Sequence, residues 1–322
     1  MTLAQTTVRE HEGDLVVTEV EHVAQDVVAI TLRDPGGGTL PAWTPGAHVD
    51  LLLAPELIRQ YSLCSSPSDS HCIRIGVLRE HDGRGGSAFI HDRLTVGATV
   101  RVRGPRNHIP LAGSPAYLFI AGGIGITPML PMLAEAEAAG ADWELWYCGR
   151  SRATMGFTGE LARYGDRVHL VPTDERGRLD LASVLGTPVA GTLVYCCGPE
   201  RLLADAEQRC AAWPPGALHL ERFAARPGQA PASGQEFELV LARTGITITV
   251  PAGRSVFDVV QEAGVSVLGS CHEGICGTCE QVVLEGEVDH RDSVLSPDEQ
   301  AANETMMICV SRCRSGRLTL DL

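Results

Sequence analysis

Three cysteines within nine residues constrain this chain more than any other feature of its sequence. Cys271, Cys276 and Cys279 have the spacing Cys-x4-Cys-x2-Cys, and Cys309 follows thirty residues later. This spacing is typical of four thiolates that hold a [2Fe–2S] cluster. Glycines between these cysteines allow the backbone to wrap closely around a compact inorganic core, because no side chain intervenes. We therefore predict an iron–sulfur site at these four residues.

A structural zinc site is the alternative interpretation of four cysteines. Zinc ligands usually occur as two short Cys-x2–4-Cys pairs, whereas Cys309 stands alone in the sequence. The spacing therefore favours the iron–sulfur cluster. His272, beside Cys271, is interpreted as a solvated loop residue and not as a Rieske-type ligand. Cys313 lies four residues past Cys309 and is interpreted as a non-ligand.

The segment around these cysteines, residues 235–322, resembles a plant-type ferredoxin domain. Alternating residues between positions 237 and 250 predict a hairpin. Ser255 and Ser296 are the predicted N-caps of two helices. The resemblance implies an α+β domain of the β-grasp type, with the cluster loop between the two helices. Cys309 is expected in the strand after the second helix.

The charge balance of the chain limits its partners. The 322 residues suit two or three domains, and 26 basic against 40 acidic residues give a net charge of −14. Nucleic acid and anionic membrane surfaces attract basic proteins, so neither is an expected partner. A protein partner with a basic docking surface is compatible with this charge.

The cysteine count and the apolar segments indicate the compartment. Eleven cysteines are an odd number, and the first residues carry no signal-peptide pattern. The longest apolar stretch, residues 116–133, is interrupted by glycines and prolines, so it is not a predicted membrane span. We therefore expect a cytoplasmic monomer with reduced thiols and no disulfide framework.

Residues 8–110 contain short strand-like segments, separated by turn residues at intervals of roughly ten residues. This spacing predicts an antiparallel β-barrel. Two motifs occur within it, RQYSL at residues 59–63 and GRGGS at residues 83–87. The second motif directly precedes a short predicted helix.

The two motifs together indicate a phosphate-bearing ring compound. A glycine-rich turn at the start of a helix presents backbone N–H groups to a phosphate. Arg59 can add a charge-assisted contact, Tyr61 can lie against a flat ring, and Ser62 can hydrogen-bond the ring edge. Taken singly, these residues also have ordinary explanations as a solvated strand residue, a core residue and a loop. Together on a β-barrel they resemble the flavin-binding domain of the ferredoxin–NADP reductase superfamily.

Residues 116–222 alternate between apolar strands and helices. This alternation predicts a parallel α/β domain whose ligand binds at the C-terminal ends of its strands. The turn at residues 122–125 follows the first strand, and Thr127 is the predicted cap of a helix with Pro128 at its first position. This turn is not a full G-x-G-x-x-G fingerprint. Combined with the YCCGP motif at residues 195–199, it resembles the pyridine-nucleotide domain of the same superfamily.

Two nearby segments bear on the choice of dinucleotide. Asp174 follows a predicted strand near the position where NADP-dependent relatives place groups for the 2′-phosphate. A carboxylate there repels that phosphate and can accept hydrogen bonds from ribose hydroxyls, which favours NADH. Arg150 and Arg152 argue the other way, because they can meet a phosphate. Solvation or contact with the pyrophosphate is the favoured explanation for these arginines.

The order of these modules is similar to that of the phthalate dioxygenase reductase and vanillate O-demethylase reductase family. The resemblance covers nearly the whole chain and implies FMN as the flavin and NADH as the donor. It implies FMN contacts from Arg59, Tyr61, Ser62, Leu63, Gly85, Gly86 and Ser87. It implies dinucleotide contacts from Gly122, Gly123, Thr127, Pro128, Arg150, Asp174, Cys197, Gly198 and Pro199. Phe223 is expected beside the flavin ring, and the residues expected at the reacting rings are Ser62, Thr127, Cys197 and Phe223.

The expected domain boundaries follow the changes in pattern. Residues 1–112 form the flavin barrel, residues 113–224 the nucleotide-binding domain and residues 235–322 the ferredoxin domain. The segment at 225–234 is rich in Pro, Gly, Ala and Ser and is the expected linker.

The resemblance implies a division of labour between cofactors. NADH delivers two electrons as hydride, a [2Fe–2S] cluster accepts one, and a flavin converts between the two. The scattered histidines form no plausible oxygen-activating set, so the terminal acceptor is expected to be another protein. A Rieske non-haem iron oxygenase acting on an aromatic or methoxy compound is favoured. A cytochrome P450 partner, or a redox-sensing binding module without turnover, are the alternatives.

Overall fold

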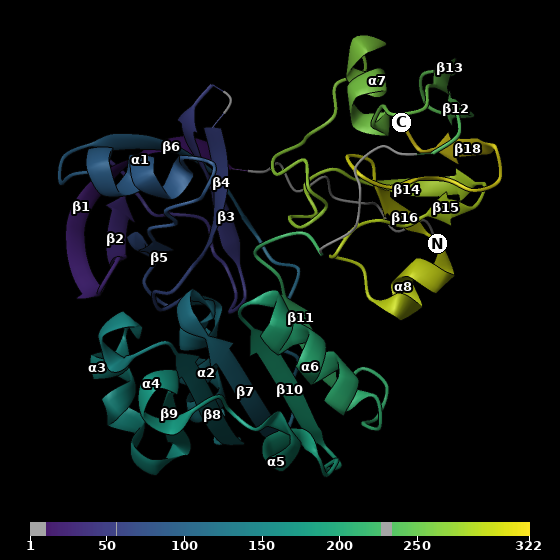
Figure 1. The fold of residues 1–322 in the computed structure, drawn as a ribbon. Coiled ribbons are helices and arrows are strands. Elements are labelled where there is room, and N and C mark those ends of the chain that lie inside the picture. Colours follow the sequence, from purple (N-terminus) through teal and green to yellow (C-terminus); the bar gives the residue numbers. More distant parts are fainter. Residues whose placement is uncertain (1–10, 56, 227–233) are drawn as a thin grey trace. The chain divides into compact units, whose positions relative to one another are not determined.

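The structure is a computed structural model that describes residues 11–55, 57–226 and 234–322. The chain divides into two compact units, Met1–Glu221 and Arg222–Leu322. The first unit contains a β-barrel and a parallel α/β sheet, and the second contains the ferredoxin-like domain (Figure 1). No helix among the described residues has the length and apolar character needed to cross a membrane.

Six antiparallel strands form the barrel, which confirms the predicted all-β flavin domain. They are β1 (Glu12–Ala24), β2 (Val27–Arg33), β3 (His48–Ala54), β4 (Leu57–Ser62), β5 (Cys72–Leu78) and β6 (Thr99–Arg106). Their order is β4-β3-β6-β1-β2-β5, and an isolated bridge between Leu63 and Ile75 links the two edges. Helix α1 (Gly86–Arg93) follows the GRGGS turn, as the sequence predicts.

Strand β2 is buried on both of its faces. Val28, Ile30 and Leu32 point into the barrel core, because successive side chains of a strand alternate. Ala29 joins the core of the neighbouring α/β sheet instead. The barrel and the sheet therefore share a packed boundary within the first unit.

Five parallel strands form the nucleotide-binding sheet, as the alternating pattern predicts. They are β7 (Ala116–Gly122), β8 (Asp142–Gly149), β9 (Val168–Pro172), β10 (Thr192–Cys197) and β11 (Leu218–Glu221). The connecting helices are α2 (Ile126–Ala138), α3 (Thr158–Leu161), α4 (Thr173–Arg176), α5 (Leu181–Leu185) and α6 (Glu200–Cys210), with 3₁₀ turns η1 (Gly123–Gly125), η2 (Arg152–Thr154) and η3 (Ala162–Arg167).

The strand order of this sheet, β11-β10-β7-β8-β9, creates a switch point between β7 and β10. The chain proceeds from β7 towards β9 on one side and returns through β10 to β11 on the other. Alternate residues of β7 pack into different cores, Phe119 against α2 and Ile120 against α5 and α6. Ligands of open α/β sheets bind at such switch points, beyond the carboxyl ends of the strands.

The predicted capping role of Thr127 is wrong. Helix α2 begins at Ile126 with Gly125 as its N-cap, because the preceding glycine turn already coils into η1. The Thr127 hydroxyl donates to the Ile124 carbonyl oxygen at 3.0 Å. Pro128 is consequently the third helical residue and not the first.

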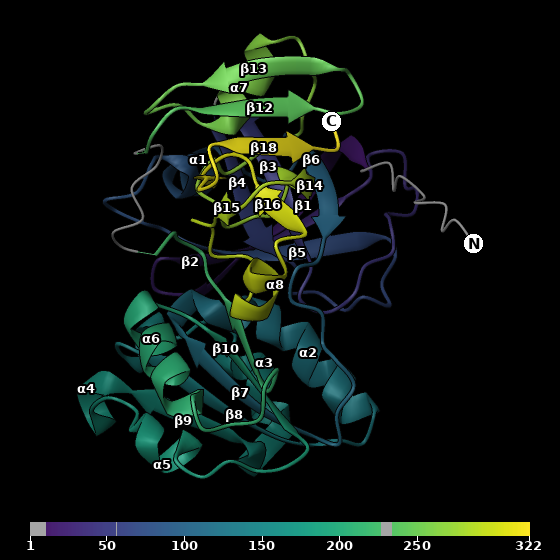
Figure 2. The same cartoon turned by 90° about the vertical axis from the view of Figure 1, so that its right-hand side faces the viewer.

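The second unit has the predicted β-grasp fold. Its strands are β12 (Phe237–Leu241), β13 (Ile246–Val250), β14 (Glu280–Glu285), β15 (Val288–Asp289), β16 (Thr305–Met307), β17 (Arg312–Cys313) and β18 (Arg317–Leu320), with helices α7 (Val256–Glu262) and α8 (Pro297–Ala302). The main sheet has the order β13-β12-β18-β14-β16 (Figure 2). Ser255 caps α7, and Ser296 and Glu299 form a full capping box on α8, as predicted.

The expectation that Cys309 lies in a strand is wrong. Strand β16 ends at Met307, whose carbonyl oxygen accepts hydrogen bonds from the N–H groups of Val310 and Ser311. These bonds close a turn after the strand. Cys309 therefore lies in this turn, where its backbone is not paired with a neighbouring strand.

Candidate functional site

The two motifs of the barrel meet in space. Arg59 on β4 donates to the Arg84 carbonyl oxygen at 2.7 Å, which ties the RQYSL strand to the GRGGS turn. A Cβ on Gly86 would lie 2.4 Å from Arg59 Cγ, so a larger residue cannot replace this glycine without movement. Gly85, the N-cap of α1, has a φ of 81°, a conformation that glycine adopts readily. The glycine turn, the guanidinium and the helix N-terminus form a cradle whose chemistry fits a phosphate.

The remaining residues of the β4 motif lie deeper in the barrel. Burial raises the pKa of the Tyr61 phenol. Leu63 is fully buried, and its N–H donates to the Ala47 carbonyl oxygen at 2.8 Å. Ser87, in the glycine turn, accepts a hydrogen bond from the Glu80 N–H at 3.0 Å. Tyr61 and Ser87 are therefore held in place by the barrel itself.

The two predicted nucleotide turns are in contact at the switch point of the sheet. A Cβ on Gly125 would lie 2.3 Å from the Cys197 carbonyl oxygen, and a Cβ on Gly122 would lie 2.7 Å from Pro199 Cδ. A Cβ on Gly198 would lie 2.9 Å from the Gly122 Cα. The glycines at these turns are thus required for close approach of two backbones. Gly123 adds a φ of 56° to the same turn.

Thr127 connects the nucleotide turn to the barrel. Its side chain is almost fully buried, and its methyl group would lie 2.6 Å from a Cβ placed on Gly76 of β5. The absence of a side chain at Gly76 therefore lets α2 approach the barrel. Thr127 lies at the boundary between the two parts of the first unit, and its expected place beside the reacting rings stays a prediction.

Glu221 is a site residue that the sequence analysis missed. It lies at the end of β11, opposite Cys197 of β10, and accepts a hydrogen bond from the Ser62 hydroxyl at 3.3 Å. Its Oε2 atom is buried and has no hydrogen-bond partner among the described residues. Burial raises the pKa of this carboxyl to about 8, against the lowering effect of the Ser62 bond. The group is therefore largely protonated at neutral pH.

Cys197 shares this buried environment. The pKa of its thiol lies well above the ordinary value, first because of burial and then because of Glu221 and Cys196. A thiol in this state is a poor nucleophile, since the thiolate is the reactive form. Cys197 is suited to pack against a ligand and not to attack it.

Asp174 and Arg150 lie close together at the carboxyl edge of the same sheet. The Asp174 N–H, in α4, donates to the Arg150 carbonyl oxygen at 3.1 Å. Arg152 is paired with Glu175, whose carboxylate oxygens lie 2.9 and 3.1 Å from its Nε. The segment that favours NADH, at Asp174, therefore contacts the segment that could favour NADPH, at Arg150. Arg152 already has an acidic partner.

Phe223 follows β11 and belongs to the second unit. Its side chain is 41% exposed. It is therefore not a core residue, and its expected place beside the flavin stays a prediction.

The four predicted cluster ligands come together in the second unit. Cys271, Cys276, Cys279 and Cys309 are all buried and unbridged. The side chains of Cys271 and Cys276, of Cys271 and Cys309, and of Cys279 and Cys309 lie close enough to interact. The neighbouring thiols, together with N–H groups of the loop, lower the pKa of the Cys271 thiol. No group of three or more His, Cys, Asp or Glu side chains within the described ranges is arranged to hold a single metal ion.

The loop around these sulfurs fits a compact guest. A Cβ on Gly269 would lie 2.4 Å from the Phe257 ring, and a Cβ on Gly274 would lie 2.6 Å from Val310 Cγ2. Both glycines let the loop close tightly over the cysteines. His272 is exposed with its ring edge-on to Phe257 at 4.8 Å, and Cys313 in β17 contacts Ser315 instead of the four sulfurs.

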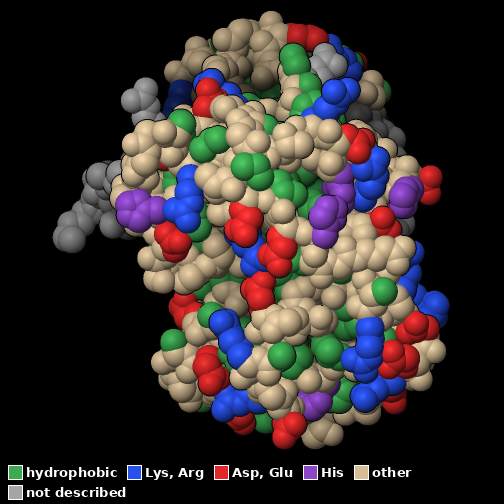
Figure 3. Space-filling view, turned by 90° about the vertical axis from the view of Figure 1, so that its left-hand side faces the viewer, with side chains coloured by type: hydrophobic (Ala, Val, Ile, Leu, Met, Phe, Trp, Pro, Cys, Tyr) green, Lys and Arg blue, Asp and Glu red, His purple; other side chains and the backbone are tan. Residues whose placement is uncertain are grey.

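The face of the molecule shown in Figure 3 carries acidic and basic side chains side by side. On this face no broad area of a single charge gathers over the described residues. Ion pairs of this kind occur in the first unit, where Arg74 lies between Glu21 and Glu160, at 2.7 and 2.6 Å.

Comparisons with known proteins match the barrel and the cysteine-containing domain to two domain families. Residues 14–110 match the oxidoreductase FAD-binding domain, and residues 239–314 match the 2Fe-2S iron-sulfur cluster binding domain.

Two curated relatives are similar over nearly their whole length. The phenoxybenzoate dioxygenase subunit beta of Ectopseudomonas oleovorans is 44% identical, over 100% of this chain and 98% of that protein. The vanillate O-demethylase oxidoreductase of a Pseudomonas species is 39% identical, over 96% of this chain and 99% of that protein.

Two solved structures match 97% of this chain. Phthalate dioxygenase reductase, a modular structure for electron transfer from pyridine nucleotides to [2Fe–2S], is 35% identical with a TM-score of 0.71 over 98% of its length. An intact type IV self-sufficient cytochrome P450 monooxygenase is 46% identical with a TM-score of 0.91. The chain spans only 41% of the length of that P450.

The fold and the site thus define an electron-transfer oxidoreductase with a flavin-binding domain and a [2Fe–2S] domain. The chain belongs to the phthalate dioxygenase reductase family, the reductase subunits of oxygenase systems.

Proposed function

We propose that this chain takes hydride from NADH onto FMN and passes single electrons through a [2Fe–2S] cluster to a separate Rieske non-haem iron oxygenase. The observation that carries the proposal is the hydrogen bond between Ser62 and Glu221. Ser62 ends the strand that carries the flavin motif, and Glu221 ends a strand at the nucleotide edge of the sheet. The bond brings the two expected ring-binding regions together.

The barrel residues support FMN as the bound flavin. Arg59, Gly85, Gly86 and Ser87 form one phosphate cradle, which suits the single phosphate of FMN. A bound flavin supplies the conversion between two-electron and one-electron transfer. Tyr61 and Ser62 would orient its ring, with Leu63 as buried support below them.

The switch-point turns support binding of the nicotinamide end of the dinucleotide. Gly122 and Gly198 let the two turns approach closely at this edge, where Pro199 also packs. We propose that these residues, with Gly123 and Pro128, contact the dinucleotide. Thr127 and Cys197 lie on the sides of the two turns. Glu221 would hold a proton next to Ser62, and the buried surroundings would exclude water from the reacting rings.

The residues expected at the adenosine end of the dinucleotide support NADH over NADPH. Asp174 repels a 2′-phosphate, and Arg152 is already neutralised by Glu175. Arg150 remains available in our proposal for the pyrophosphate.

The cysteine set supports the cluster assignment. Four buried sulfurs in neighbouring pairs match the donor requirement of one [2Fe–2S] core. We infer that Cys271, Cys276, Cys279 and Cys309 are its ligands, and that Phe223 lies near the flavin as in the family.

The relatives support a Rieske partner, because one of them is a dioxygenase subunit and another is an O-demethylase oxidoreductase. The similarity to a self-sufficient P450 supports a second candidate, a haem monooxygenase. We further infer that the chain is a cytoplasmic monomer with boundaries near residues 112, 224 and 235. The eleven free cysteines agree with a reducing compartment.

Reconstitution of turnover separates the two partners. The purified chain is mixed with NADH and either a Rieske oxygenase or a P450 from the same genome, and consumption of each oxygenase's substrate is measured. We expect coupled turnover with the Rieske protein. Coupling only to the P450 would transfer the proposal to the second candidate, and coupling to neither, with no NADH oxidation by an artificial acceptor, would refute both.

A further inference from the structure

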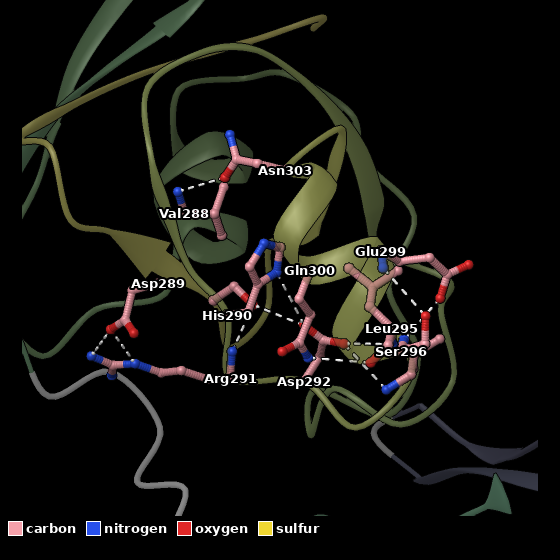
Figure 4. A network of polar contacts seen from close by, with 12 residues as sticks. Val288, Asp289, His290, Arg291, Asp292, Leu295, Ser296, Glu299, Gln300 and Asn303 are labelled. Carbon is pink, nitrogen blue, oxygen red and sulfur yellow. Dashed lines mark hydrogen bonds and ion pairs between the residues drawn. The ribbon is translucent and has the colours of Figure 1, made fainter. Parts of the chain in front are cut away.

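Residues 291–295 form a short turn around the Asp292 carboxylate, and we call it the Asp292 turn (Figure 4). The Asp292 side chain is fully buried. Its Oδ2 atom accepts hydrogen bonds from the N–H groups of Leu295 at 2.8 Å and Val294 at 3.2 Å. The carboxylate therefore holds the turn closed from inside.

The other carboxylate oxygen ties the turn to neighbouring elements. Asp292 Oδ1 lies 3.4 Å from the Ser311 hydroxyl and 3.6 Å from His290 Nδ1. Burial alone would raise the pKa of Asp292, but the contact with His290 and the backbone N–H groups hold it below the ordinary value. Ser311 lies two residues after Cys309 and also accepts a hydrogen bond from the Arg291 N–H at 3.2 Å. The turn is thus anchored beside the segment that carries the fourth cysteine.

The Asp292 turn is also hydrogen-bonded to the loop that carries the other three cysteines. The Ser293 N–H donates to the Gly274 carbonyl oxygen at 2.8 Å. A Cβ on Gly274, whose φ is 67°, would lie 3.0 Å from the Asp292 Cα. The loop and the turn are therefore in direct backbone contact.

The hydrogen bond from Ser293 to the Gly274 carbonyl oxygen orients the Ile275 N–H towards the Cys271 sulfur. The peptide unit between Gly274 and Ile275 is planar, so its carbonyl oxygen and its N–H point to opposite sides. The carbonyl oxygen accepts from Ser293, and the Ile275 N–H on the other side donates to the Cys271 sulfur. The Glu273 N–H reaches the same sulfur at 3.3 Å.

We propose that Asp292 is a positioning residue that tunes the iron–sulfur site through this relay from carboxylate to turn, from turn to Gly274 and from Ile275 N–H to Cys271. The inference rests on the proposed assignment of the four cysteines as cluster ligands. N–H groups directed at cluster sulfurs stabilise the more negative, reduced form, and so raise the reduction potential. Asp292 would therefore favour reduction of the cluster without contacting it.

The sign of a potential change distinguishes the relay from simple charge. Replacing Asp292 by Ala removes an anion, which by Coulomb's law alone would raise the cluster potential. Loss of the relay would instead loosen the Ile275 N–H bond and lower the potential. Asp292→Asn keeps an acceptor oxygen for the turn while removing the charge.

The experiment uses full-length holoprotein and three variants, Asp292→Ala, Asp292→Asn and the control Asp289→Ala. Asp289 is a neighbouring acid that pairs with Arg291 at 2.6 Å. Iron and acid-labile sulfide are counted first, then the cluster potential by redox titration, and amide hydrogen exchange across residues 272–276. We expect a lower potential and faster exchange in Asp292→Ala than in the parent, because the turn no longer holds Gly274.

The outcomes are separable. Asp292→Asn is expected to keep slow exchange without any fall in potential, and Asp289→Ala to match the parent in exchange. An unchanged or raised potential in Asp292→Ala, or equally fast exchange in Asp289→Ala, would overturn the relay. If Asp292→Ala cannot be purified with its iron, the exchange rate of Asp292→Asn decides, and fast exchange there counts against the proposal. A parent protein without iron would refute the cluster assignment instead.

Discussion

Glu221 lies in an environment that departs strongly from ordinary solution chemistry. It is a carboxylic acid at the end of a parallel strand, with one oxygen bonded to Ser62 and the other without a partner among the described residues. A buried carboxyl in this setting keeps its proton. Perturbed groups of this kind often mark functional sites.

Glu221 makes a testable contribution to the pH dependence of stability. Its folded pKa of about 8 lies above the ordinary 4.5, so the folded protein retains a proton that the unfolded chain releases. The associated stability is complete below pH 4.5 and is lost as pH rises through 8, by up to about 1.4 kcal/mol per pH unit. Denaturant unfolding of flavin-free protein across this window should show the loss in the parent and a flatter profile in Glu221→Gln. Glu144→Gln, at an exposed carboxylate, is the control, and parallel profiles for Glu221→Gln and the parent would contradict the assigned pKa.

The cysteines give a second prediction at the scale of residues. Cys276→Ser should lose most of the iron and sulfide, because each ligand thiolate holds an iron of the core. Cys313→Ser is the matched control, since Cys313 lies only four residues from Cys309 yet contacts Ser315. Iron analysis and visible absorption measure both variants. Stoichiometric zinc in the parent, or equal cluster loss in Cys313→Ser, would be incompatible with the ligand set.

At the scale of elements, a hydrogen bond from Arg59 to the Arg84 carbonyl oxygen joins strand β4 to the turn before α1, and we propose that the two elements bind the flavin together. Arg59→Ala should weaken flavin retention by roughly 1.5–3 kcal/mol, the usual contribution of a hydrogen bond to a charged group. Arg79→Ala serves as the control, because Arg79 pairs with Asp92 of α1 at 2.7 Å and lies outside the cradle. Equilibrium dialysis against free FMN gives the affinities. Equal losses in both variants would show that the cradle is misassigned, and recovery of FAD from the native protein would refute FMN.

The edge formed by β9 and α4 carries the prediction on the dinucleotide. The parent should prefer NADH in kcat/KM, and Asp174→Ser should narrow the preference because the repelling carboxylate is gone. Asp142→Ser, at the opposite end of the sheet where β8 begins, should leave the preference unchanged. Steady-state rates with each dinucleotide test this. A parent that uses NADPH more efficiently would invalidate the interpretation of Asp174.

The elements also show what the sequence could predict. Alternating and continuous apolar runs identified the barrel and the parallel sheet, and paired cap residues located α8, because these signals are local. The sequence does not reveal the N-cap of α2, because the glycine turn before Thr127 coils into a 3₁₀ turn that no single residue signals. It does not reveal the turn at Cys309 either, because backbone hydrogen bonds alone close the turn after β16.

The site was predictable where motifs carry it and not where only the fold assembles it. Arg59 and the GRGGS turn are recognisable in sequence, and the structure brings them into contact. Glu221 lies 159 positions from Ser62, and its surrounding sequence resembles any apolar strand end. Asp292 likewise has no motif, since its importance depends on the approach of two loops.

At the scale of the whole molecule, the proposed function requires electrons to cross from one unit to the other. The flavin cradle and nucleotide turns belong to the unit Met1–Glu221, and the cysteines belong to Arg222–Leu322. In the proposed function, NADH delivers hydride to the first unit, and the second unit passes electrons to the terminal oxygenase. A direct test therefore adds NADH and follows reduction of the flavin in the first unit and of the cluster in the second.

Anaerobic addition of NADH to the holoprotein, monitored by visible absorption and by electron paramagnetic resonance, provides that test. The account predicts that the flavin band bleaches and that the signal of a reduced [2Fe–2S] cluster then develops in the same sample. In Cys276→Ser the flavin should still bleach, but no cluster signal should follow. Bleaching of the flavin in fully iron-loaded parent protein without any cluster signal would contradict the proposed electron path.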